Sequence, residues 1–335
     1  MGMRPSAARV VPTRAVLLGV VVGVPFSLLM LYLAARGLDA QRTLHALTDA
    51  DPLPLAVAVA TFGLLYCVQA VRWRYVSRHV AVLPWRTFLR FIIAGVAINN
   101  VVPGRPGDLM RVFWLGRAAH IPPARALATV VVDRSADVLV LLGALAATYP
   151  VIPHPEWLDR LVLGALALGT TIAVLLIGMR WVGTRTSRDV TRIRGAWVRR
   201  HWAILARGAA SSLTRRDLAV IGGLTIVGWS LWAAAAWMVA TSVGVTLAPW
   251  QAVFITGLIN LGSALPSSPG FIGTFQWLAV AGLGLMSVPH TQAFAFSVLL
   301  HAAWYVPTTV AGAVIALSAS VGWFGGRPTV ESPPA

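Results

Sequence analysis

One long stretch of this chain contains no charged side chain. Between Leu218 and Gly326 there is no Asp, Glu, Lys or Arg. A water-soluble domain needs charged residues on its surface, so a stretch of this length is suited to lipid. Hydrophobic residues make up 57% of the 335 residues and charged residues only 11%, which is outside the range of soluble proteins. The sequence therefore predicts an all-α, polytopic integral membrane protein.

Six apolar runs are long enough to cross a bilayer core of about 30 Å, which needs roughly 20 helical residues. They lie at 16–35, 53–71, 126–149, 161–181, 218–241 and 291–319. The first run follows three arginines, as a signal peptide does, but its apolar part is longer than a usual signal-peptide core. We interpret it as a retained helix. Residues 1–335 are then expected to form a single membrane domain with about six full spans.

The arginines predict the orientation of these spans. All 27 basic residues are arginine, the formal net charge is +16, and the arginines cluster at the ends of the apolar runs. Such clusters face the cytoplasm. We expect cytoplasmic N- and C-termini and a basic cytoplasmic loop at 183–216, which is either an interfacial helix on anionic lipid or a solvated topology anchor. The clustering also argues against a nucleic-acid partner.

The sequence Pro-x-x-Pro-Gly occurs twice, at 103–107 and 266–270, and each copy interrupts an apolar stretch. Proline removes a backbone donor and glycine loosens the chain, so neither copy continues a helix. Broken backbone is tolerated at membrane depth only where protein or a water-filled cavity satisfies its polar groups. Basic residues flank the first break on both sides, which predicts a re-entrant hairpin that enters from the cytoplasm.

The two breaks belong to two similar units, 53–149 and 218–319. Each unit consists of a span, a re-entrant broken-helix hairpin and another span. Counting spans places the second break on the outer side, opposite the first, so the units are expected to be inverted repeats. Inverted repeats around broken helices are a recurring transporter architecture, with the substrate site near the midplane.

Three charged residues lie inside the predicted span at 126–149. At 1.5 Å per residue, Asp133 is about 10 Å and Asp137 about 16 Å from the helix start. Ionised groups at this depth must pair or face a cavity, and they are functional candidates. The two aspartates share a helix face, so a cation is expected between them, and Arg134 is spaced to reach Asp137.

The first break carries a second charged group, Arg105, Asp108 and Arg111. We expect Arg105 or Arg111 to reach Asp133. Guanidinium groups bind phosphate bidentately and the start of a half-helix favours an anion, which points to a lipid phosphate. Asp108 either orients one arginine or caps the next half-helix. The charges either only hold the hairpin against the next span or also contact the substrate, and the sequence leaves both alternatives open.

Uncharged polar residues near the two breaks complete the set of candidate substrate-binding residues. Asparagines can line the same cavity or satisfy carbonyls left open by the breaks. The second break is uncharged, which favours an apolar gate facing the polar first break. These candidates are Asn99, Asn100, Ser267, Ser268, Gly270 and Gln276.

No pattern indicates a catalytic residue, a metal or a cofactor. Cys67 is the only cysteine and lies in an apolar run, so a thiolate site is not expected. The histidines downstream of His120 are too scattered for a metal-ligand set.

The chain resembles the lysylphosphatidylglycerol synthase transmembrane region family, the flippase-like part of the multiple peptide resistance factor. The resemblance rests on residues 99–108 with Arg111, on 132–134 with Asp137, and on 265–273. It implies a multi-pass protein of the plasma (inner) membrane of a bacterium or archaeon that binds or translocates polar lipids. Full-length synthases add a soluble aminoacyl-transferase domain, and this chain ends soon after Arg327, so synthase activity is not expected. The family often has glutamate at the positions of Asp108 and Gln276.

These observations favour a polar-lipid flippase or lipid-transporting membrane protein, with a phospholipid or lipid-linked substrate. The alternative is a membrane enzyme or accessory subunit that acts on aminoacylated or glycosylated lipids, with Asp133 and Asp137 as catalytic groups. A third is a non-catalytic partner for a separately encoded lipid-modifying enzyme. The sequence also leaves a homo-oligomer open.

Overall fold

The computed structural model describes residues 13–103, 105–153, 155–184, 214–262 and 268–322. The described residues form helices and connections, without a β-strand. The helices are α1 (Thr13–Ala35), α2 (Ala40–Thr48), α3 (Pro52–Ser77), α4 (Trp85–Val101), α5 (Pro106–Ala118), α6 (Pro123–Thr148), η1 (Tyr149–Val151), α7 (Glu156–Thr184), α9 (Arg215–Ser242), α10 (Pro249–Gly262), η3 (Pro269–Phe271), α11 (Thr274–Gly284) and α12 (His290–Gly322).

Four helices among the described residues, α3, α7, α9 and α12, are long and apolar enough to cross a membrane. α6 is as long as α3 but carries Asp133, Arg134 and Asp137. α1 has 23 residues and includes the apolar segment Gly23–Ala35. The predicted all-α, polytopic membrane fold is confirmed. The predicted basic loop at 183–216 lies almost wholly outside the described residues.

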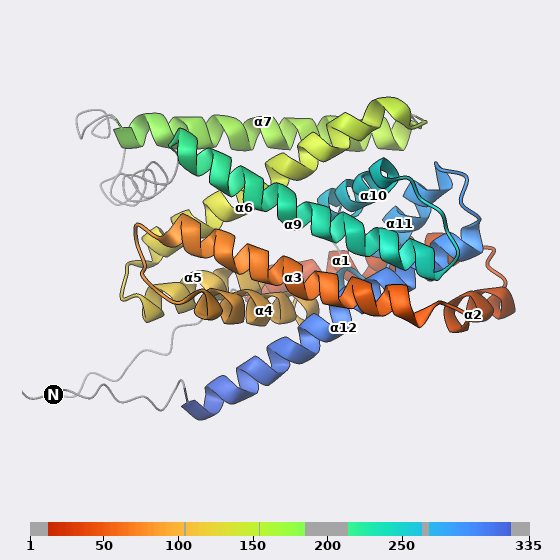
Figure 1. Cartoon of the computed structure of the whole chain (residues 1–335), viewed down its shortest axis with the longest axis horizontal. Coiled ribbons are helices and arrows are strands. Elements are labelled where there is room, and N and C mark those ends of the chain that lie inside the picture. The colour runs from red at the N-terminus through yellow and green to blue at the C-terminus, as the bar shows by residue number, and fades with distance from the viewer. Residues whose placement is uncertain (1–12, 104, 154, 185–213, 263–267, 323–335) are drawn as a thin grey trace, which may run out of the picture.

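Helices α3 and α9 form an antiparallel pair at the centre of the molecule (Figure 1). At one end, the Asp51 N–H donates to the Ser242 carbonyl at 2.8 Å. At the other end, Asp217 accepts from the Tyr75 hydroxyl at 3.0 Å and pairs with Arg78. Small buried residues let the two helix backbones approach closely. They are Ala58 and Ala70 on α3, and Ala235, Ala236 and Ala240 on α9.

The first Pro-Gly sequence forms the corner of a helical hairpin between α4 and α5. The two helices have 17 and 13 residues, and each is too short to cross a bilayer core alone. They pack closely at Gly107, where a Cβ atom would lie 1.9 Å from the Gly95 carbonyl oxygen. The break therefore needs glycine at this position.

The second Pro-Gly sequence lies between α10 and α11, which have 14 and 11 residues and also contact one another. The chain enters α11 through Gly273, whose φ of 94° is in the region that only glycine adopts freely. A Cβ atom at Gly273 would lie 1.9 Å from the Ser27 carbonyl oxygen of α1. The second corner is thus packed against the first helix.

The two hairpins begin at opposite ends of the α3–α9 pair. α4 follows the C-terminal end of α3 and α10 follows the C-terminal end of α9, and these two ends point in opposite directions because the pair is antiparallel. Figure 1 shows α4 and α5 toward one end of the long axis and α10 and α11 toward the other. This arrangement brings the two corners toward each other within the molecule.

Candidate functional site

Arg72 of α3 lies between the two aspartates of α6. Its Nε donates to Asp133 Oδ1 at 2.9 Å, and its Nη1 and Nη2 donate to the two Asp137 oxygens at 2.6 and 3.1 Å. The Arg72 side chain is 3% exposed, and the two carboxylates are 3% and 7% exposed. A cation between the aspartates was predicted, but this residue was not. The predicted span ended at residue 71, whereas α3 continues to Ser77 and buries Arg72.

Arg111 of α5 is the second buried cation of the network. Its Nη2 donates to Asp133 Oδ2 at 3.1 Å, so Asp133 binds Arg72 and Arg111 together. The Arg111 guanidinium lies 4.1 Å from the centroid of the Trp73 ring, and the Trp73 Nε1 donates to Thr129 at 3.1 Å. With 2% of its side chain exposed, Arg111 is fixed in place by protein contacts and is a poor candidate for direct ligand binding.

Arg134 links the aspartate of the first break to α6. Its Nη2 donates to Asp108 Oδ1 at 2.9 Å and its Nη1 donates to Asp137 Oδ2 at 3.3 Å. Arg111 also contacts Asp108, at 3.5 Å. The side chains of Arg134 and Asp108 are 36% and 25% exposed, so this pair forms the accessible edge of the network. Asp108 therefore orients arginines, and its side chain makes no cap bond to another described residue at the start of α5.

Helix α9 completes the network with two uncharged side chains, one that accepts a hydrogen bond and one that donates a hydrogen bond. Arg72 Nη1 also donates to Thr225 Oγ1 at 3.0 Å, and Trp229 Nε1 donates to Asp137 Oδ1 at 3.1 Å. The network thus joins α3, α5, α6 and α9. A buried carboxylate left without its cation is strongly destabilising, so these contacts hold the first hairpin against the core.

Arg105 differs from the other arginines of the first break. It has a left-handed backbone, with φ of 55°, at the start of α5, and its side chain is exposed. It makes no ion pair with another described residue, so of the two arginines considered for Asp133 it is Arg111 that binds this aspartate. Its guanidinium lies 5.3 Å from the centroid of the Phe271 ring in the second break. With Arg105 included, the cluster has four arginines and three aspartates.

Asn99 and Asn100 satisfy the backbone and neighbouring helices at the first break. Asn99 Oδ1 accepts from the Gly107 N–H at 2.7 Å, across the corner of the hairpin. Asn100 Nδ2 donates to Thr309 Oγ1 of α12 at 2.8 Å, and its carbonyl accepts from the Tyr305 hydroxyl at 3.2 Å. The Asn100 Oδ1 atom is buried and has no hydrogen-bond partner in the described part of the chain. Both asparagines therefore hold the break, and Asn100 retains one open acceptor.

The second break contains Ser268 and Gly270, while Ser267 lies outside the described residues. The Ser268 N–H donates to the Ser27 hydroxyl at 2.6 Å, and its own hydroxyl donates to the Ile272 carbonyl at 3.0 Å. Gly270 has φ of 69°, and a Cβ atom there would lie 2.6 Å from the Tyr305 ring and 3.2 Å from the Asn100 carbonyl oxygen. Gly270 thus permits contact between the two breaks.

Gln276 binds a histidine that the sequence pattern did not single out. Its Oε1 accepts from the Gly273 N–H at 2.7 Å, so its amide nitrogen is the donor to His301 Nδ1 at 2.8 Å. In neutral His301 the proton is then on Nε2, which is buried and has no hydrogen-bond partner among the described residues. The second break is therefore polar at its centre, although it has no formal charge.

The two breaks meet at one junction. Arg105 faces Phe271, the Tyr305 hydroxyl binds the Asn100 carbonyl, and the His301 ring lies 5.3 Å from the Tyr305 ring, measured between centroids. Tyr305 thus links α12 to the first break. The junction presents one exposed cation beside two buried polar atoms that have no hydrogen-bond partner among the described residues.

Comparison with known proteins identifies relatives over nearly the whole chain. The Haloferax volcanii protein named glycosyltransferase AglD is 25% identical over 343 residues, which cover 90% of this chain and 54% of the relative. A UPF0104 membrane protein of Methanothermobacter thermautotrophicus is 29% identical over 39% of each chain. Another, from Methanocaldococcus jannaschii, is 23% identical over 46% of each. The matches cover about half or less of these relatives.

The family model of the lysylphosphatidylglycerol synthase transmembrane region matches residues 16–312. This range includes both hairpins, the α3–α9 pair and the complete charged network. It ends within α12, beyond the Tyr305 contact to the first break. The chain is a multi-pass membrane protein and belongs to the lysylphosphatidylglycerol synthase transmembrane region family.

Proposed function

We propose that this protein binds a polar lipid and moves its headgroup across the membrane, with Arg105 as the contact to the lipid phosphate. The observation that carries this proposal is the contrast between the arginines. Arg72 and Arg111 are buried and bound to aspartates, whereas Arg105 is exposed and makes no ion pair with a described residue. Its position at the start of α5 adds the partial positive charge of a helix N-terminus.

The buried network serves as the fixed support for this contact. Asp133 and Asp137 are each bound by two arginines, which leaves them poorly suited to hold a metal or to act as acid or base. The Arg134–Asp108 pair is the more accessible part. A phosphate that approaches Arg105 also comes near Asp108, so ligand binding can compete with Asp108 for Arg134.

The opposed hairpins supply the conformational part of the proposal. α4–α5 and α10–α11 enter as re-entrant hairpins from the two membrane faces and meet at the Arg105–Phe271 contact. In this arrangement the units 53–149 and 218–319 are inverted repeats, and one unit rocks against the other to expose the junction to alternate sides. We place both termini in the cytoplasm and the protein in the plasma membrane of a bacterium or archaeon, which the archaeal relatives support.

Transport by the purified protein tests this proposal directly. The full chain is reconstituted in liposomes that contain headgroup-labelled anionic or glycosylated lipids, and the appearance of label on the other leaflet is followed. We expect Arg105→Ala to slow movement at least tenfold, since a charge-assisted hydrogen bond contributes about 1.5–3 kcal/mol. Arg117→Ala, at another exposed arginine of α5, is the matched control. Movement no faster than in empty vesicles for any such lipid would exclude the proposal.

The named relative favours a second candidate function. Because the Haloferax volcanii relative is a glycosyltransferase by name, the chain is also a candidate accessory subunit that presents a lipid-linked sugar to a separately encoded enzyme. Co-purification from native membranes distinguishes the two. A stable complex with a glycosyltransferase or aminoacyltransferase, together with no lipid movement by the isolated chain, would favour the subunit.

A further inference from the structure

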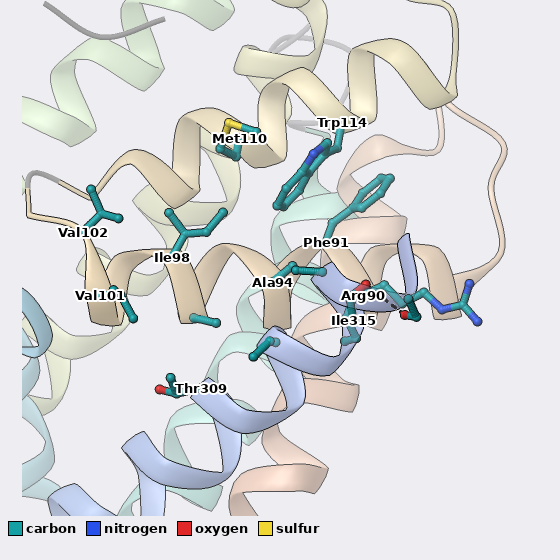
Figure 2. Close-up of a pocket in the computed structure, with 15 residues that line it drawn as sticks. Arg90, Phe91, Ala94, Ile98, Val101, Val102, Met110, Trp114, Thr309 and Ile315 are labelled. Carbon is teal, nitrogen blue, oxygen red and sulfur yellow. Dashed lines mark hydrogen bonds between the residues drawn. The ribbon is translucent and has the colours of Figure 1, made fainter. Parts of the chain in front are cut away.

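A groove of about 790 Å³ lies between α4, α5 and α12 (Figure 2). This volume is within the range of about 300–1,000 Å³ that is typical of small-molecule sites. Its walls are almost entirely apolar, with Phe91, Ile98 and Met110 on one side and Ala313 and Ile315 of α12 on the other. Such walls bind hydrocarbon, because a polar molecule would lose hydrogen bonds to water without replacing them.

The groove has one charged end and one end at the first break. Figure 2 shows Arg90 at one end and Val101, Val102 and Thr309 at the other. From Arg90 to its last residue, Val101, α4 rises about 16.5 Å at 1.5 Å per residue. One leaflet of a hydrocarbon core is about 15 Å thick, as half of about 30 Å. The groove therefore matches the depth of a single leaflet, with an arginine at headgroup level.

We infer that this groove binds one acyl chain of an anionic phospholipid of the cytoplasmic leaflet, with the phosphate at Arg90. Arg90 is the charged residue among those that line the groove, it is exposed, and it makes no ion pair with another described residue. A guanidinium and a phosphate form strong, charge-assisted hydrogen bonds. Trp114 also lines the groove, as expected for a ring that contacts lipid. This inference rests on the proposed function for its membrane orientation.

The deep end of the groove is coupled to the candidate site. Thr309 lines the groove, and its hydroxyl accepts the hydrogen bond from Asn100 that holds the first break. The floor is a close α4–α12 contact, where a Cβ atom at Gly312 would lie 2.2 Å from the Ala97 Cβ. A lipid chain in the groove thus touches the residues that position the junction. A lipid bound in the groove therefore lies beside the first break, from which it can enter the candidate site.

Lipid cross-linking to the full-length protein tests the inference. The probe is phosphatidylglycerol with a photoactivatable diazirine in one acyl chain, and the cross-linked peptides are mapped by mass spectrometry. Ala313→Phe combined with Ala316→Phe fills the groove from two exposed positions on α12. Ala302→Phe makes the same change at an exposed position of α12 outside the groove. Arg90→Ala is compared with Arg86→Ala, an exposed arginine one turn earlier.

We expect wild-type cross-links on α4 and α12 that fall at least tenfold in the groove-filling variant and are unchanged in Ala302→Phe. Arg90→Ala is expected to weaken phosphatidylglycerol binding about fivefold, since one arginine near an anionic lipid contributes about 1 kcal/mol. No cross-links in these helices, or equal loss in the Ala302→Phe control, would overturn the inference. So would a dimer that dissociates when the groove is filled, because a second copy would then be the occupant.

The result of the cross-linking experiment can be distinguished from the result of the transport experiment. Groove cross-links in a protein that moves no lipid would refute transport and leave the binding site standing. Lipid movement by a protein without groove cross-links would refute the binding site alone.

Discussion

Arg72 and Asp137 form a bidentate ion pair between α3 and α6, with Nη1–Oδ1 and Nη2–Oδ2 distances of 2.6 and 3.1 Å. Parallel hydrogen bonds of this kind fix the geometry of both side chains. Because Arg72 also binds Asp133, a single guanidinium bridges two buried carboxylates. The predictions about stability follow from this arrangement.

Replacing Arg72 by alanine should destabilise the protein by at least 3–5 kcal/mol, roughly the cost of breaking a buried ion pair. The measurement is thermal unfolding of the purified protein in detergent, followed by tryptophan fluorescence. Arg74→Ala, at an exposed arginine of the same helix, should change the unfolding temperature little. Adding Asp137→Asn to Arg72→Ala should restore part of the loss. Equal unfolding temperatures for the two arginine variants would contradict this role for Arg72.

Replacing Asp108 by asparagine should separate stability from transport. The Asp108–Arg134 pair is partly exposed, and such pairs contribute about 0–1 kcal/mol. We therefore expect an almost unchanged unfolding temperature and an altered rate of lipid movement in liposomes. Asp133→Asn removes the carboxylate that binds two buried arginines and should unfold at a much lower temperature. A large loss of stability in Asp108→Asn would show that Asp108 is a structural residue.

Replacing Gly107 by alanine should prevent the first hairpin from closing. The new Cβ atom would lie 1.9 Å from the Gly95 carbonyl oxygen, so the two helices must separate. Overpacking of this kind typically costs about 1–3 kcal/mol. Gly143→Ala in α6 is the control, because a Cβ atom there meets no atom within 4 Å, and it should stabilise the helix by about 0.5–1 kcal/mol. A tolerated Gly107→Ala would refute the close packing at this corner.

Replacing His301 by leucine should weaken the junction between the breaks. The Gln276 amide nitrogen would lose its buried acceptor, which costs about 1–3 kcal/mol. Thermal unfolding measures this loss, and a leucine at the exposed His45 serves as a comparison. A variant that unfolds at or above the wild-type temperature would contradict a stabilising role for the Gln276–His301 hydrogen bond.

Single cysteines near the start of each hairpin should be labelled from opposite sides of the membrane. In a Cys67→Ala background, Val82→Cys precedes α4 and Pro249→Cys begins α10, and both positions are exposed. A membrane-impermeant maleimide should reach residue 82 from the cytoplasmic side and residue 249 from the outside. Labelling of both from the same side would rule out the inverted arrangement.

The sequence allowed the first hairpin to be located closely because its signals are local. Pro84 directly precedes α4, which begins at Trp85, and the Pro-Gly sequence at 103–107 follows its last residue, Val101, closely. The contact of Arg134 with Asp137 likewise follows from their spacing on one helix. Such features depend on a few consecutive residues.

Arg72, the central cation of the network, and His301 are placed by tertiary contacts, and the sequence did not predict either of them as a site residue. Arg72 lies among arginines that resemble the cytoplasmic flank of a span. Its spacing could have indicated that it is buried, because it lies seven residues after Leu65 and four before Val76, which are both buried on α3. His301 is 25 positions from Gln276, and no motif connects them. Only the packing of α12 against α11 brings this pair together.

The contacts between α3 and α9 limit how these two helices can move relative to one another. It is tied by the Asp51–Ser242 bond at one end, by Asp217 at the other, and by the Arg72–Thr225 bond between them. Two helices joined at three points along their length cannot slide past one another. The pair can therefore serve as an axis, and rocking of one unit against the other must turn about it, which moves the short helices α4, α5, α10 and α11 most.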